Sequence, residues 1–163
     1  MGINRGATNL DKDSTNSKTE KKLYNFLLDK GLITEYIEWE EKNKPGIPVH
    51  IFNSTLGPYE SICKYLKEQG FKNAEIARMT GRDSKSVWQA INKAKKKYSK
   101  KFLNKKSEYV LPYDVLQDDK YSILENIVTR LKTQYNLGFT KIGELIDRDP
   151  RTIWTIYQRS IKR

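Results

Sequence analysis

The sequence has very few of the residues that usually hold metals or form disulfides. It contains one cysteine, Cys63, and one histidine, His50, among 163 residues. A lone cysteine cannot form a disulfide within the chain, which fits a reducing cytoplasm. One cysteine and one histidine on different predicted elements cannot make a zinc site of the usual kind. We therefore expect no metal and no cofactor, and a core position for Cys63, which falls on an apolar helical stripe.

The sequence also lacks the motifs that most often identify an active site. It has no glycine-rich phosphate loop, no nucleophile elbow and no serine, histidine and aspartate set. Asp118 and Asp119 precede a predicted helix, where they are more simply an N-cap than a nuclease centre. We expect no enzymatic activity and assign no catalytic residues. No hydrophobic run approaches the length of a membrane span and no signal peptide is visible, so we expect a cytoplasmic, nucleoid-associated protein.

Acidic residues are too few to balance the basic ones, and the imbalance is localised. The formal net charge is +11. Residues 1–46 are neutral, because they hold 8 of the 31 basic and 8 of the 20 acidic residues. Residues 47–163 hold the remaining 23 basic and 12 acidic residues and carry the whole excess. This localisation indicates a polyanionic partner, with a generally lysine-rich proteome as the alternative explanation.

The segment from Asn73 to Lys97 has the pattern of two helices joined by a tight turn. Gly81 stands where such a turn needs a positive φ angle, and Asp83 is a candidate N-cap for the second helix. Ala77, four residues before the glycine, is small enough for a close helix crossing. The second helix carries an apolar stripe at i, i+3, i+4, i+7 spacing, formed by Val87, Ala90, Ile91 and Ala94.

The same pattern occurs a second time, over residues 138–163. An aspartate replaces the turn glycine there, and aspartate tolerates the left-handed conformation better than most residues. Upstream, IPVHIF at 47–52 matches LPYDVL at 111–116, so each repeat is an extended lead-in followed by three helices. The start of the last helix is supported by Pro150, a favoured first helical residue. The equivalent pairs are Ala77 and Gly143, Gly81 and Asp147, Asp83 and Asp149, Val87 and Ile153, and Trp88 and Trp154.

The spacing of Ala77, Gly81 and Val87 resembles the helix-turn-helix of DNA-binding regulators, in the three-helix form of sigma-factor region 4. Two such copies resemble archaeal-type transcription regulators, including the archaellum-operon activators of methanogens. The resemblance implies an all-α fold of two tandem three-helix helix-turn-helix domains with a short N-terminal helical arm. Helix pairs that merely pack are the alternative. The expected segments are a disordered tail at 1–19, a helical arm at 20–46, the first repeat at 47–98, a basic linker at 99–110 and the second repeat at 111–163.

In a helix-turn-helix the second helix enters the major groove, and residues near its N-terminus meet the base edges. Both expected recognition helices keep polar and basic residues outside their apolar stripe, and a solvated face is the alternative interpretation. Trp88 and Trp154 lie either against the DNA backbone or at the core edge; we favour the core edge, because an indole carries much apolar surface. The candidate DNA-binding residues are Arg82, Ser84, Lys85, Ser86, Gln89, Asn92, Lys93 and Lys96 in the first repeat, and Arg148, Arg151, Thr152, Thr155, Gln158 and Arg159 in the second.

These observations predict a sequence-specific protein for double-stranded DNA, and a transcription regulator in particular, that reads two different half-sites. An RNA-binding or nucleoid-coating protein is one alternative, since it needs the charge but not the differing reader residues. Another is a protein-interaction module that docks on RNA polymerase or general transcription factors through Tyr36, Ile37 and Trp39. We expect the arm either to cover its own repeat or to form a homodimer contact.

Overall fold

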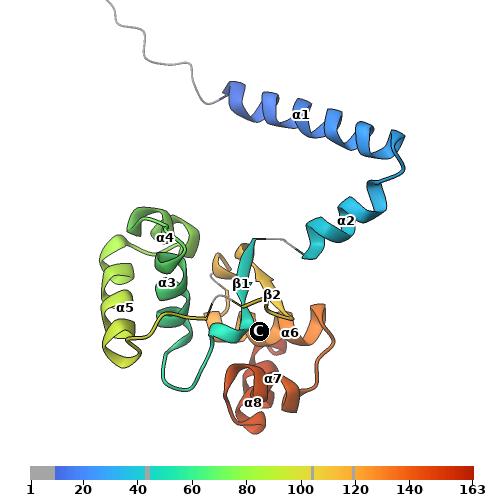
Figure 1. Cartoon of the computed structure of the whole chain (residues 1–163). Coiled ribbons are helices and arrows are strands. Elements are labelled where there is room, and N and C mark those ends of the chain that lie inside the picture. The colour runs from blue at the N-terminus through green and yellow to red at the C-terminus, as the bar shows by residue number, and fades with distance from the viewer. Residues whose placement is uncertain (1–9, 43–44, 104, 119) are drawn as a thin grey trace, which may run out of the picture. The chain divides into compact units, whose positions relative to one another are not determined.

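Figure 1 shows a computed structural model of the chain, which describes residues 10–163 apart from 43–44, 104 and 119. In this part of the chain helices dominate, accompanied by a small two-stranded sheet and two short 3-10 helices. The mostly helical fold expected from the sequence is therefore observed. Side chains are described over the same residues except at 10–16 and 39–42.

The first of two compact units covers residues 1–44 and contains two helices, α1 (Leu10–Asp29) and α2 (Ile33–Lys42). The expected disordered tail is wrong for residues 10–19, which begin α1; residues 1–9 lie outside the described part. The composition of residues 10–19 does not explain this helix, because Asp, Ser, Thr and Asn prevail there and are weak helix formers. The side chain of Trp39 also lies outside the described residues. Large exposed apolar side chains on this unit are Leu23, Tyr24, Phe26, Leu28, Leu32 and Ile37.

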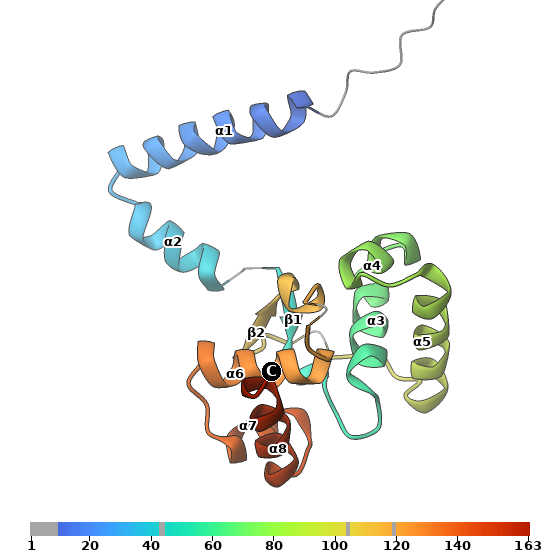
Figure 2. The same cartoon turned by 180° about the vertical axis from the view of Figure 1, so that it is seen from behind.

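The second unit, residues 45–163, contains the same order of elements twice (Figures 1 and 2). Each copy has a lead-in, made of a short strand and a 3-10 helix, and then three α-helices. We call residues 46–97 the first repeat and residues 110–161 the second repeat. The first contains β1 (Gly46–Pro48), η1 (Val49–Ile51), α3 (Pro58–Glu68), α4 (Asn73–Thr80) and α5 (Ser84–Lys97); the second contains β2 (Val110–Pro112), η2 (Tyr113–Leu116), α6 (Ile123–Gln134), α7 (Phe139–Ile146) and α8 (Pro150–Ile161).

Local signals fix the turn before the last helix of each repeat, as the sequence predicted. Gly81 and Asp147 both adopt the left-handed conformation, with φ angles of 62° and 54°. Asp83 then caps α5 by accepting a hydrogen bond from the backbone nitrogen of Ser86 at 2.9 Å. Asp149 caps α8 in the same way, with the backbone nitrogen of Arg151 at 2.8 Å.

The expected N-cap of α6 at Asp118 and Asp119 is wrong. The helix begins after Ser122, whose hydroxyl oxygen accepts a hydrogen bond from the backbone nitrogen of Glu125 at 3.2 Å. The Glu125 carboxylate accepts in turn from the backbone nitrogen of Ser122 at 2.8 Å, a reciprocal pair that satisfies two helix-end N–H groups. Asp118 instead accepts from the backbone nitrogen of Lys120 at 3.0 Å, and Asp119 lies outside the described residues.

An antiparallel sheet of β1 and β2 joins the two repeats. Figures 1 and 2 show it between α3–α5 and α6–α8. Each lead-in also reaches the other repeat, because η1 contacts α7 and η2 contacts α4. Helices α3 and α6 contact each other as well. The paired residues are Gly46 with Pro112, Ile47 with Leu111, and Pro48 with Val110.

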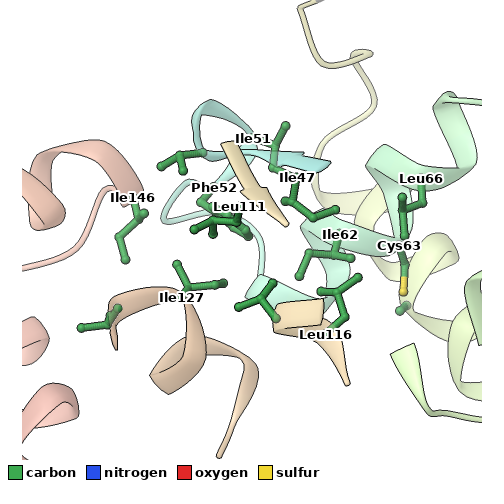
Figure 3. Close-up of a cluster of buried hydrophobic side chains, with 14 of the residues drawn as sticks. Ile47, Ile51, Phe52, Ile62, Cys63, Leu66, Leu111, Leu116, Ile127 and Ile146 are labelled. Carbon is green, nitrogen blue, oxygen red and sulfur yellow. The ribbon is translucent and has the colours of Figure 1, made fainter. Parts of the chain in front are cut away.

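One continuous hydrophobic core serves both repeats. Figure 3 shows Leu111 at its centre, with Ile62 of the first repeat on one side and Ile127 of the second on the other. Cys63 lies in this core, as expected, and burial raises the pKa of its thiol to about 11. The lead-ins therefore do more than connect domains, since they supply the apolar surface on which both sets of helices pack.

Candidate nucleic-acid interface

The last two helices of each repeat cross at a small residue. Ala77 occupies this buried place in the first repeat and Gly143 in the second. A Cβ on Gly143 would lie 2.5 Å from the carbonyl oxygen of Arg148, so the expected lack of room is confirmed there. The turns match in detail, because Arg82 N–H donates to the Ala77 carbonyl at 3.0 Å and Arg148 N–H to the Gly143 carbonyl at 2.9 Å.

Helices α5 and α8 bury one stripe and present the opposite face to solvent. The predicted apolar stripe of α5 is buried, and Ile153 and Ile156 are buried in α8. Asn92 and Gln158, at equivalent places, lie half-buried at the edge of the outer face. The exposed predicted residues are Ser84, Lys85, Gln89, Lys93 and Lys96 on α5, and Arg151, Thr152, Thr155 and Arg159 on α8.

The two tryptophans do not lie where the sequence interpretation favoured. Trp88 is 59% exposed and Trp154 is 52% exposed, so neither closes the core edge. Each directly follows a buried β-branched residue, and the next position on a helix turns about 100° away from the core. Trp88 instead borders a surface hollow on α5, where the other lining residues that the structure describes are polar or basic: Gln89, Asn92, Lys93, Lys95 and Lys96.

That hollow also includes Lys95, which the list of candidate residues lacked. Lys95 is exposed and lies three residues after Asn92, so helical spacing from Trp88 and Asn92 was enough to find it.

Ser86 has a structural partner of its own. Its hydroxyl donates to the Asp83 carboxylate at 2.7 Å, so the hydroxyl proton is not free for the DNA contact predicted for this residue. Hydrogen bonds from the Ser86 hydroxyl and backbone hold the pKa of Asp83 below its usual value, so the cap remains charged. In the first turn of α5 this leaves the exposed Ser84 and the helix N-terminus to meet an anion.

The side chains of the two turn arginines contact residues at the start of α3 and in the loop just before it. The guanidinium of Arg82 lies 4.8 Å from the centre of the Tyr59 ring. Arg148 is half-buried and donates to the carbonyl oxygen of Leu56, in the other repeat, at 3.4 Å. The side chain expected to bind DNA at Arg148 therefore helps to join the two repeats, which no local sequence signal indicates.

The lysine-rich stretch that begins at the end of α5 is anchored to α3 at two points. Lys97 forms an ion pair with Glu60 at 2.9 Å. Burial alone would raise the pKa of Glu60, but hydrogen bonds from Lys97 and the Gly57 backbone hold it below its usual value. Phe102 donates its backbone N–H to Glu68 at 3.0 Å. The expected basic linker at 99–110 thus begins packed against α3.

Clusters of metal-binding side chains are absent from the described part of the chain, where no three His, Cys, Asp and Glu residues could hold an ion together. Within the same residues, no helix combines the length and apolar character needed to cross a membrane.

The chain was compared with protein-family models, curated proteins and solved structures, and nothing matched in any of the three. Its function is therefore argued from the residues of α5 and α8 and from their surroundings.

Proposed function

We propose that the protein binds double-stranded DNA sequence-specifically, as a transcription regulator that reads two half-sites with α5 and α8. In this proposal α4–α5 and α7–α8 are helix-turn-helix motifs, and the two repeats are tandem domains of that type. One observation carries it: both helices expose polar and basic side chains at equivalent positions, opposite their buried stripes. Such a helix face suits the major groove, where base edges offer hydrogen-bond partners.

The chemistry of these side chains assigns them to different bases. Gln89 and Asn92 carry amides that bond adenine N6 and N7 together, whereas Lys85 and Arg151 suit guanine O6 and N7. The Thr155 hydroxyl donates to the Arg151 carbonyl at 2.9 Å, which leaves its methyl group to meet thymine. The two helices therefore read different sequences.

The basic residues around these readers supply affinity without sequence preference. Lys93, Lys95, Lys96 and Arg159 are exposed on the same two helices and are suited to phosphate contacts. Each phosphate that they neutralise adds a slope of roughly −0.9 to the plot of log K against log salt. Binding is therefore expected to weaken steeply as salt rises.

Selection of bound sequences from random duplex DNA tests the proposal. We expect an enriched motif, and we expect Gln89→Ala and Arg151→Ala to relax preference at two different base pairs, each by about 1–3 kcal/mol. Strong binding without any motif would favour the alternative of RNA binding or nucleoid coating. Affinity that stays flat between low and physiological salt would count against every nucleic-acid partner.

A second function has an observation of its own in the first unit. Residues 23–37 expose several large apolar side chains, including Phe26 and Ile37, and surfaces of this kind mark protein contacts. We propose docking on the transcription machinery, RNA polymerase or general transcription factors, as this alternative function. Deletion of residues 1–44 tests it: loss of polymerase binding with unchanged DNA affinity supports docking, whereas loss of a homodimer in sedimentation assigns the surface to a second copy of the chain.

A further inference from the structure

The pairing of β1 with β2 has a symmetry that the order of elements does not require. Residues 46–48 of the first repeat are equivalent to residues 110–112 of the second. Ile47 pairs with Leu111, the equivalent residue of the second repeat. When each residue of the two flanking pairs is replaced by its equivalent, one pair becomes the other. An antiparallel pair centred on equivalent residues is carried onto itself by a two-fold rotation and not by a shift along the chain.

The packing outside the sheet follows the same exchange. The contact of η1 with α7 has its counterpart in the contact of η2 with α4, since α4 and α7 are equivalent helices. Helix α3 contacts α6, which is the equivalent of α3 in the second repeat. Repeats stacked by translation would instead place the end of one against the beginning of the next. The strand pairing and the helix contacts are therefore all consistent with one approximate two-fold axis, which passes through the middle of the sheet and relates the two repeats.

We infer that this axis relates α5 to α8, so that the DNA target is an imperfect inverted repeat with one half-site for each helix. The inference rests on the function proposed above. The strands of a duplex are themselves related by two-fold axes, and a two-fold pair of recognition helices therefore meets equivalent positions on opposite strands. A single chain thus presents the arrangement that helix-turn-helix proteins usually obtain by dimerisation.

The inverted repeat is imperfect because the equivalent readers differ in part. Lys85 and Arg151 are both cations suited to guanine, so the base that they meet is expected to be the same in both half-sites. Gln89 is matched by Thr155, so the next position is expected to differ. The protein itself departs from symmetry at Asp147, which accepts hydrogen bonds from Ser54 while the equivalent Gly81 has no side chain to do so.

Exchanging the readers provides the test. The variant Lys85→Arg/Gln89→Thr/Asn92→Gln gives α5 the readers of α8, and the matched control Arg151→Lys/Thr155→Gln/Gln158→Asn gives α8 those of α5. All six side chains are exposed or half-buried, so thermal unfolding should stay close to that of the wild type. The full-length wild type and both variants are used to select sequences from random duplex DNA.

We expect the wild type to select an imperfect inverted repeat and each variant to select a perfect one, built on different half-sites. Placing the same half-sites in direct order should weaken binding by about 10²–10⁴-fold, the usual gain when a second site binds intramolecularly. A direct repeat, or a single half-site that no variant makes symmetric, would overturn the inference and leave the proposed function standing. Absence of any enriched sequence would overturn the proposed function, and this inference with it.

Discussion

At the scale of single residues, the two repeats form the same turn with glycine at different positions. The first repeat places alanine at the helix crossing and glycine in the left-handed turn, at Ala77 and Gly81. The second places glycine at the crossing and aspartate in the turn, at Gly143 and Asp147. The sequence predicted both arrangements because turn and cap chemistry is local. It did not predict the exposure of Trp88. The position of a side chain around the helix axis decides its burial, and Trp88 points away from the core although its indole has a large apolar surface.

We predict that Gly143→Ser destabilises the second repeat by about 1–3 kcal/mol, the usual cost of overpacking a full site. The new Cβ would lie 2.5 Å from the backbone oxygen of Arg148, which is not the end of a flexible side chain. Gly138→Ser is the matched control, because a Cβ there meets nothing within 4 Å and serine is a preferred N-cap residue. Thermal unfolding measures both, and equal midpoints for the two variants would contradict the crossing geometry.

Asp147 should make stability depend on pH. Hydrogen bonds from the Ser54 hydroxyl and backbone hold the pKa of this carboxyl below its ordinary value of 3.8. Because the folded-state pKa is the lower one, the contribution is complete above the unfolded-state pKa and is lost as pH falls through the folded-state pKa. Asp147→Asn isolates the charge, since asparagine also tolerates the left-handed turn. Between about pH 5 and about pH 2 the unfolding temperature of the wild type should fall further than that of the variant; parallel curves would contradict this.

At the scale of elements, helices with a clear stripe and a local cap were predictable, and their outer faces with them. The bounds predicted for α4 and α5 match the structure, because Gly81 and Asp83 mark the turn between them. The predicted start of α6 is wrong, because the reciprocal cap of Ser122 and Glu125 sets where the helix begins. The strands are only three residues long, so their extended form was predictable from the sequence but their pairing depends on the rest of the fold.

Lys93 and Lys96, both exposed on α5, should position DNA without reading its bases. We predict that Lys93→Ala/Lys96→Ala weakens binding about equally on all duplex sequences and reduces the salt slope by about 2, one for each lost phosphate contact. Lys97 is left intact because its ion pair with Glu60 makes its removal a change in stability as well.

Lys21→Ala/Lys22→Ala is the matched control, since it removes the same charge from exposed positions of α1. Titration over a range of salt concentrations measures all three proteins. A changed preferred sequence in the α5 variant would show that these lysines read bases.

At the scale of the whole second unit, the sequence predicted that the same order of elements occurs twice. The contact of each lead-in with the other repeat was not predictable from the sequence. It depends on which helices each short segment packs against, and the composition of the segment does not determine that. Ile51 and Leu116 have the same buried, apolar character in either arrangement. The observed exchange gives the two repeats one shared hydrophobic core in place of two separate ones.

A shared core predicts that the two repeats unfold together. Ile47→Ala and Leu111→Ala should each cost about 2–5 kcal/mol, because both side chains are 0% exposed at the centre of the sheet. Fluorescence of Trp88 reports on the first repeat in a variant with Trp39→Phe and Trp154→Phe. Fluorescence of Trp154 reports on the second repeat in a variant with Trp39→Phe and Trp88→Phe.

Urea unfolding followed by either tryptophan should then give one transition with the same midpoint, and either core variant should shift both reporters equally. Leu103→Ala is the control, because that side chain is 73% exposed and its loss should cost less than about 0.5 kcal/mol. If Ile47→Ala moved the Trp88 midpoint alone, the repeats would be independent domains and the exchanged lead-ins would not bind them into one unit. Coincident shifts would mean that neither α5 nor α8 holds its place without the other repeat, as the proposed two-fold arrangement within one chain requires.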